Sequence, residues 1–105
     1  MDDLKRYKPA TLSAQALGWI DERTRAVIPP LHVATTFIRD EDNQYRAGYD
    51  YARDGHPAFE QGEALLKALE GGAAARLFAS GMTAATTAFL ALKPGDHVVA
   101  PKIMY

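Results

Sequence analysis

The feature that most constrains the fold is a strand–helix–strand pattern in the last third of the 105-residue chain. Residues 76–79 predict a short buried strand, Met82 to Leu92 a helix, and residues 97–100 a second apolar strand that ends before Pro101. Two strands joined through a helix run parallel, and the crossover between them is right-handed. The pattern therefore predicts a βαβ unit of an α/β fold.

This unit is too apolar to form a finished surface. Of residues 71–105, 20 are apolar. Parallel strands occur almost only in sheets that helices cover on both faces, and two strands with one helix do not meet that requirement. A usual domain has ~150 residues, which is more than this chain contains. We therefore expect the chain to be the beginning of a larger α/β domain.

Composition and charge exclude several classes of partner. Twelve Lys and Arg residues against 13 Asp and Glu residues give a formal net charge of -1, so no basic surface for nucleic acid or anionic lipid is expected. The uncharged run at residues 77–92 is shorter than the ~20 apolar residues of a membrane span, and the N-terminus does not resemble a secretory signal. The chain has no cysteine, which is compatible with a reducing cytoplasm. We expect a cytoplasmic protein that binds neither nucleic acid nor membranes.

A helix is predicted directly before the βαβ unit. Pro57 suits the first helical turn, the apolar positions within residues 58–69 share one face, and Gly71-Gly72 ends the helix. Glu63 and Lys67 have the i,i+4 spacing of an ion pair on this helix.

The residues before this helix have no regular pattern. We expect a short helix near residues 13–17 and one extended piece over residues 33–38. The sequence thus predicts an irregular N-terminal arm at residues 1–56 and the beginning of a large domain at residues 57–105.

The turn at residues 79–83 is a candidate anion-binding site. It lies at the start of a predicted helix, where free backbone N–H groups and the helix dipole favour negative charge, and Gly81 lets an anion approach the main chain. The chain has no GxGxxG, GxxxxGK[ST] or GxSxG motif, so a dinucleotide fingerprint, a P-loop and a serine nucleophile are not supported. Two interpretations stay open: a phosphate-binding turn, or a helix that Ser80 simply caps.

A second polar segment, residues 49–57, leads directly into the helix predicted at Pro57. Arg53 supplies fork-shaped donors and Tyr51 a hydroxyl, and both suit a phosphate or a carboxylate. A solvated surface loop is the alternative. The chain has three histidines, His32, His56 and His97, and their spacing fits no metal motif, so no metal site is expected.

Taken together, these segments resemble the N-terminal part of the Cys/Met-metabolism pyridoxal-phosphate enzymes, the trans-sulfuration family of cystathionine γ-synthases and lyases. The resemblance runs from about residue 11 onward. It rests on the order and spacing of Ile28-Pro29-Pro30-Leu31 through Thr35-Thr36-Phe37, Tyr51-x-Arg53-x-x-x-Pro57, Leu69-Glu70-Gly71-Gly72, Ser80-Gly81-Met82 and Gly95-Asp96-His97-Val98-Val99. The chain departs from the family pattern at His56, where Asn is usual, and at Ala58, where Thr is usual.

The resemblance implies fold type I architecture, with an N-terminal arm and the start of a large three-layer domain. It implies pyridoxal 5'-phosphate as cofactor and a homotetramer built from dimers that share active sites. Tyr51 and Arg53 match the pair that reaches from the arm to the cofactor phosphate of a neighbouring subunit. Gly81 and Met82 match the pair whose backbone amides bind that phosphate. Tyr105 matches the tyrosine that stacks on the pyridine ring near the reacting amino acid, as cofactor contact and catalytic residue.

The implied reaction is β- or γ-elimination, or γ-replacement, on cystathionine, an O-acylhomoserine or a related sulfur-containing amino acid. No lysine of the chain matches the family's Schiff-base lysine, which falls later in the full sequence. These residues alone are therefore expected to be catalytically inert. The alternative function is a small non-enzymatic α/β module whose exposed apolar surface binds a partner protein.

Overall fold

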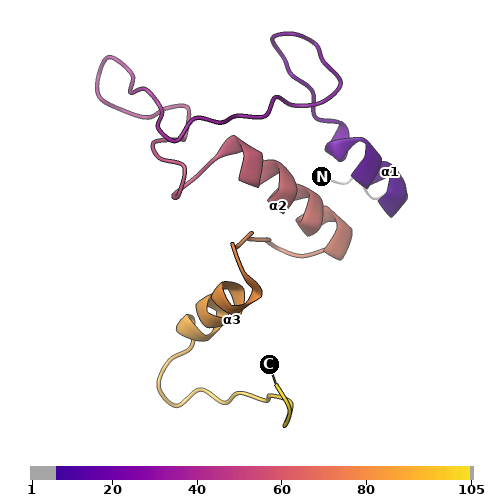
Figure 1. Ribbon diagram of the computed structural model, residues 1–105, viewed down its shortest axis with the longest axis vertical. Coiled ribbons are helices and arrows are strands. Elements are labelled where there is room, and N and C mark those ends of the chain that lie inside the picture. The colour runs from indigo at the N-terminus through magenta and orange to yellow at the C-terminus, as the bar shows by residue number, and fades with distance from the viewer. Residues whose placement is uncertain (1–6, 105) are drawn as a thin grey trace.

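Three α-helices and one 3₁₀ turn make up the regular structure of residues 7–104, the part of the chain that the computed structural model describes (Figure 1). They are α1 (Pro9–Ala14), η2 (Ala16–Gly18), α2 (Pro57–Glu70) and α3 (Gly81–Leu90). α1 and η2 pack beside α2, whereas α3 lies apart from them. None of the described helices has the length and apolar content needed to cross a membrane.

α2 confirms the helix predicted at Pro57, because its ends carry clear signals. His56 is the N-cap, and Pro57 occupies the first helical position, where its missing N–H costs nothing. At the other end Gly71 adopts a left-handed backbone conformation with φ 64°, and its N–H donates to the carbonyl of Lys67. Glycine adopts this conformation without steric cost, so the helix ends there.

α1 lies earlier in the chain than the short helix predicted near residues 13–17. It begins at Pro9, which again suits the first turn. It ends at Ala14, and Leu17, with φ 62°, and Gly18, with φ 78°, then adopt left-handed conformations. The prediction was wrong about the start because it gave no weight to Pro9 as a helix initiator.

α3 confirms the second predicted helix, although it begins one residue earlier and ends two residues earlier than predicted. The helix runs from Gly81 to Leu90, with Ser80 as N-cap, whereas the sequence predicted Met82 to Leu92.

The two strands predicted at residues 76–79 and 97–100 do not form. Across residues 7–104 the backbone pairing of β type is one isolated antiparallel bridge between Thr36 and Tyr51. A strand exists through hydrogen bonds to a neighbouring strand, and neither predicted segment has such a neighbour among the described residues. In the described residues the predicted βαβ unit is therefore one helix, α3, between two segments without strand pairing.

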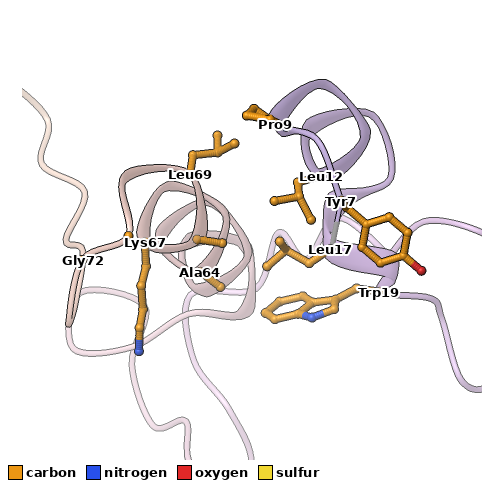
Figure 2. A pocket seen from close by; sticks show the side chains of 11 residues that line it. Tyr7, Pro9, Leu12, Leu17, Trp19, Ala64, Lys67, Leu69 and Gly72 are labelled. Carbon is orange, nitrogen blue, oxygen red and sulfur yellow. The ribbon is translucent and has the colours of Figure 1, made fainter. Parts of the chain in front are cut away.

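α1 and α2 line a shared apolar pocket that is open on one side. A cavity of about 660 Å³ lies between them, and Figure 2 shows Leu12 and Leu17 pointing from the α1 side toward Ala64 and Leu69 of α2. Leu12, at 8% exposure, is the buried apolar residue of the described part of the chain. This contact is the beginning of a core rather than a closed one.

The rest of the chain is open. The radius of gyration of the chain is 17.7 Å, whereas a compact domain of about 100 residues has roughly 13 Å. Apolar residues of the arm are exposed to solvent, among them Val33 at 93% and Ile38 at 95% exposure. The open shape does not favour the alternative of a small self-contained α/β module.

Candidate functional site

Among the described residues, two backbone N–H groups at the start of α3 are unpaired. The Ser80 side-chain oxygen accepts from the Thr83 N–H at 3.1 Å, and the Ser80 carbonyl accepts from the Ala84 N–H at 3.1 Å. Within residues 7–104 the amides of Gly81 and Met82 have no hydrogen-bond acceptor. Ser80 therefore caps the helix and still leaves two donors free, so the two interpretations of this turn do not exclude one another.

The space in front of these amides is open. A Cβ placed on Gly81 would meet no atom within 4 Å, and Met82 is 56% exposed. The N-terminal end of α3 also carries the positive end of the helix dipole. Two free donors, an open approach and a positive potential together suit an anionic oxygen such as that of a phosphate.

The second candidate group is the pair of Tyr51 and Arg53. An Arg53 Nη2–H donates to the Tyr51 hydroxyl at 3.2 Å, and the guanidinium carbon lies 5.0 Å from the centre of the Tyr51 ring. Both side chains are exposed. Arg53 has no acidic partner in the described part of the chain, so its remaining N–H donors are available to an anion.

Backbone contacts fix the loop that carries this pair. On one side of Tyr51 the Phe37 N–H donates to the Asp50 carbonyl at 3.2 Å, and on the other the Ala52 N–H donates to the Thr35 carbonyl at 2.9 Å. The Tyr51 carbonyl then accepts from the N–H groups of Asp54 and Gly55, which closes a turn around Arg53. The segment is thus an ordered turn, and its Tyr51 and Arg53 side chains are exposed.

His56, noted in the sequence as a departure from the family pattern, joins this turn to α2. Its Nδ1 accepts from the Ala58 N–H at 3.2 Å, and its Nε2 lies 2.9 Å from the Ala34 carbonyl oxygen. The residue is 6% exposed. Its place directly before Pro57 is the sequence signal for a helix cap, although His is not among the common capping residues.

Glu63 is a further contact that sequence reasoning missed. Its carboxylate accepts from the Leu77 N–H at 3.0 Å and from Arg76 Nη1. The pair predicted with Lys67 does not form; Arg76 takes that place. The pKa of Glu63 lies below its ordinary value, mainly because the Leu77 N–H donates to its carboxylate and to a smaller extent because Arg76 does. Glu63 thereby ties the connection that leads into α3 to the side of α2.

A close approach lies beside this contact. Leu77 Cδ1 is 2.9 Å from the position that a Cβ would occupy at Gly62. The absence of a side chain at Gly62 lets the connection lie flat against α2.

The two candidate groups do not meet within this chain. In Figure 1 the extended part of the arm, between α1 and α2, runs above α2, and α3 lies below it. No hydrogen bond, ion pair or ring contact between described residues joins Arg53 to Gly81 or Met82. Tyr105, predicted as cofactor contact and catalytic residue, lies outside the described residues.

Known proteins match this chain over nearly all its length. The model of one family, described as Cys/Met metabolism PLP-dependent enzyme, matches residues 10–105. Cystathionine gamma-synthase of Mycobacterium tuberculosis (strain ATCC 25618 / H37Rv) is 45% identical over 98 residues, which cover 92% of this chain and 25% of that protein. Cystathionine beta-lyase MetC of Bacillus subtilis (strain 168) is 42% identical over 85 residues, 81% of this chain and 22% of that protein.

A solved structure matches as well. The crystal structure of metB from Corynebacterium glutamicum superposes with a TM-score of 0.79 at 37% identity, over 90% of this chain and 25% of that one. The described helices and their extended connections therefore follow the fold of the corresponding part of that structure. The chain spans about a quarter of the length of the relatives it matches.

Proposed function

Because the chain belongs to the Cys/Met-metabolism PLP-dependent enzymes, we propose that it forms the N-terminal quarter of an enzyme acting on a sulfur-containing or O-acylated amino acid. The reaction class is elimination at the β or γ carbon, or γ-replacement, with cystathionine or an O-acylhomoserine as substrate. One of the relatives is named as a synthase and another as a lyase, which supports the substrate class without selecting one direction.

The observation that carries this proposal is the pair of free amides at the open start of α3. Gly81 and Met82 donate their backbone N–H groups to the cofactor phosphate, and the helix dipole adds a favourable potential. When bound, pyridoxal 5'-phosphate supplies an electron sink for the carbanion formed on the amino acid. The residues of this chain fix the phosphate end of the cofactor and thereby the orientation of its ring.

Tyr51 and Arg53 supply the second set of donors, from the arm of a neighbouring subunit. The lack of contact between this pair and α3 within one chain supports an arrangement in which each phosphate is bound by two subunits. The Arg53 guanidinium offers a charge-assisted contact to the phosphate, and Tyr51 keeps the guanidinium in place through its hydroxyl and its ring. Sites shared in this way fit a homotetramer built from dimers.

The proposal includes the architecture and the remaining expectations from the sequence. Residues 1–56 form the arm, and residues 57–105 begin the large three-layer domain; the likeness to the metB structure supports fold type I. Tyr105 stacks on the pyridine ring near the reacting amino acid. The enzyme works in the cytoplasm.

The test uses the full-length protein that carries these residues. Purified protein is expected to show the visible absorbance of protein-bound pyridoxal phosphate, which is lost on removal of the cofactor and regained on its addition. It is then incubated with cystathionine alone, and with an O-acylhomoserine plus cysteine, while released keto acid and newly formed cystathionine are measured. Turnover in one of these assays supports the proposal. A folded protein that binds no pyridoxal phosphate contradicts it.

A further inference from the structure

The His56 imidazole has a defined tautomer because its two ring nitrogens face unlike partners. The Ala34 carbonyl oxygen, 2.9 Å from Nε2, can only accept, and the Ala58 N–H, 3.2 Å from Nδ1, can only donate. The proton is therefore on Nε2, and Nδ1 is the acceptor. The side chain acts as donor at one end and acceptor at the other.

These two hydrogen bonds have different consequences. The bond from Ala58 closes the first turn of α2. The bond to Ala34 reaches a residue 22 positions earlier in the chain, in the extended segment of the arm. The rings of Phe37 and Phe59, at 5.8 and 5.3 Å between ring centres, flank the imidazole and complete its burial. His56 is thus the junction of the arm and α2.

The segment that His56 holds is the one that pairs with the loop of Tyr51. Thr35, next to Ala34, accepts from the Ala52 N–H, and Phe37 donates to the Asp50 carbonyl. These two bonds lie on either side of Tyr51 and precede the turn around Arg53. A fixed Ala34 backbone therefore fixes the extended segment at residues 34–37. That segment in turn fixes the backbone from which the Tyr51 and Arg53 side chains project.

We propose that His56 is a positioning residue, which holds Tyr51 and Arg53 in place for the cofactor phosphate through its Nε2–H bond to Ala34. The inference rests on the proposed function of that pair. His56 touches neither side chain by a hydrogen bond, and its effect passes through the backbone of residues 34–37 and 50–52.

Two substitutions in the full-length protein separate the two bonds of His56. In His56→Ser the hydroxyl oxygen replaces Nδ1 and keeps a cap on α2, but nothing reaches Ala34. In His56→Gln the amide nitrogen replaces Nε2 and keeps the bond to Ala34, while the cap is lost. We expect His56→Ser to weaken pyridoxal phosphate binding about tenfold and His56→Gln to leave it within about twofold of wild type, although His56→Gln has the lower melting temperature.

Pyridoxal, which lacks the phosphate, gives the specific readout. A loss of the phosphate contact leaves pyridoxal affinity unchanged in His56→Ser, whereas general loosening of the site weakens both ligands alike. Phe59→Leu serves as the matched control, because it disturbs the packing around the imidazole and keeps both of its hydrogen bonds. It is expected to lower the melting temperature without a phosphate-specific effect.

Hydrogen exchange of the cofactor-free protein gives a readout that does not depend on cofactor binding. The amides of Phe37 and Ala52, which pair the two segments, are expected to exchange at least severalfold faster in His56→Ser than in His56→Gln. Equal exchange in the two variants, or equal losses of pyridoxal and pyridoxal phosphate affinity, would overturn the inference. A wild-type protein that binds no pyridoxal phosphate contradicts the proposed function instead, and the exchange comparison then still decides whether His56 holds this loop.

Discussion

The arm and α3 hold their proposed phosphate donors in opposite ways. At α3 the donors are main-chain amides, and the Ser80 cap that leaves them free comes from the adjacent residue. In the arm the donors are the side chains of Tyr51 and Arg53, and the contacts that place them come from the distant segment around Thr35 and from His56. The first set depends on local sequence, whereas the second depends on how remote parts of the chain meet.

Removing one main-chain donor should have the largest effect. Gly81→Pro deletes the N–H at the first helical position, where proline is well tolerated, and Ser80 already has the extended conformation that precedes proline. Losing a hydrogen bond to a charged group costs about 1.5–3 kcal/mol, so we expect pyridoxal phosphate affinity of the full-length enzyme to fall roughly 10- to 150-fold. The measurement is a cofactor titration at constant helix content by circular dichroism.

Gly81→Ala is the matched control for this experiment. It keeps the N–H, and its Cβ would meet no atom within 4 Å in the described residues. If Gly81→Ala loses as much affinity as Gly81→Pro, the amide is not the phosphate donor and the contrast between the two regions breaks down.

Removing the arm cation should have the next largest effect. Arg53→Ala deletes a charge-assisted contact, and we expect about a tenfold loss of cofactor affinity. Arg53→Lys keeps the charge without the planar fork and should recover part of that loss. Arg46→Ala is the control on the same arm, because the Arg46 guanidinium is paired with Asp42. An equal loss of affinity in Arg46→Ala would mean that Arg53 acts only through the net charge of the arm and not through a contact with the phosphate.

A mixture of two variants tests whether the donors come from different subunits. Arg53→Ala subunits have an intact α3 start, and Gly81→Pro subunits have an intact arm. Hybrids formed by refolding the two together should contain one site with both sets of donors, so tight cofactor binding should return to part of the sites. Hybrids that bind no better than either parent would place both sets of donors in one subunit.

A smaller effect is expected where α2 holds the connection to α3. Glu63→Gln loses the ion pair with Arg76 and keeps an acceptor for the Leu77 N–H, so the free energy of unfolding should fall by about 1 kcal/mol at neutral pH. Because the pKa of Glu63 is lowered in the folded state, its contribution is present above the ordinary value of 4.5 and is lost as pH falls below it. Denaturant unfolding should therefore show the two proteins converging in acid. Glu70→Gln, at a carboxylate with no ion pair among the described residues, is the control, and a pH-independent difference would contradict the role of the charge.

The smallest effect concerns a second link between the arm and α2. The Tyr49 hydroxyl donates to the Glu60 carboxylate, and this bond raises the pKa of Tyr49 to about 12. A raised pKa means that the neutral phenol stabilises the fold below pH 10 and that this contribution is lost as pH rises through about 12. In Glu60→Gln the phenolate absorbance should appear at lower pH. Tyr49→Phe should lower the free energy of unfolding by only about 0.5 kcal/mol. If the pKa of Tyr49 stays raised in Glu60→Gln, its cause is burial and not the bond to Glu60.

The features that the sequence predicts best are the helix ends and turns, which residues close together in the chain determine. Pro57 and Gly71 mark the ends of α2, and Ser80-Gly81 marks the start of α3, because caps and turns act within a few residues. The same local signals predict the candidate anion site at Gly81.

The errors arise where a partner must come from elsewhere. Residues 76–79 have the composition of a strand, yet a strand needs a paired neighbour, and the described residues offer none. Glu63 has the right spacing for Lys67, but Arg76 reaches it from the following connection. The link from His56 to Ala34 spans 22 residues and leaves no local pattern, so only the structure reveals it.

The missing side chain at Gly62 has a consequence for the divergence of related sequences. Leu77 occupies the volume that a side chain at position 62 would need, so these two positions share one fixed space although they lie on separate segments. A relative that carries a larger residue at position 62 is expected to carry a shorter one at position 77, or to turn that side chain toward the solvent it already partly faces at 47% exposure. The two sites should therefore change together rather than one at a time.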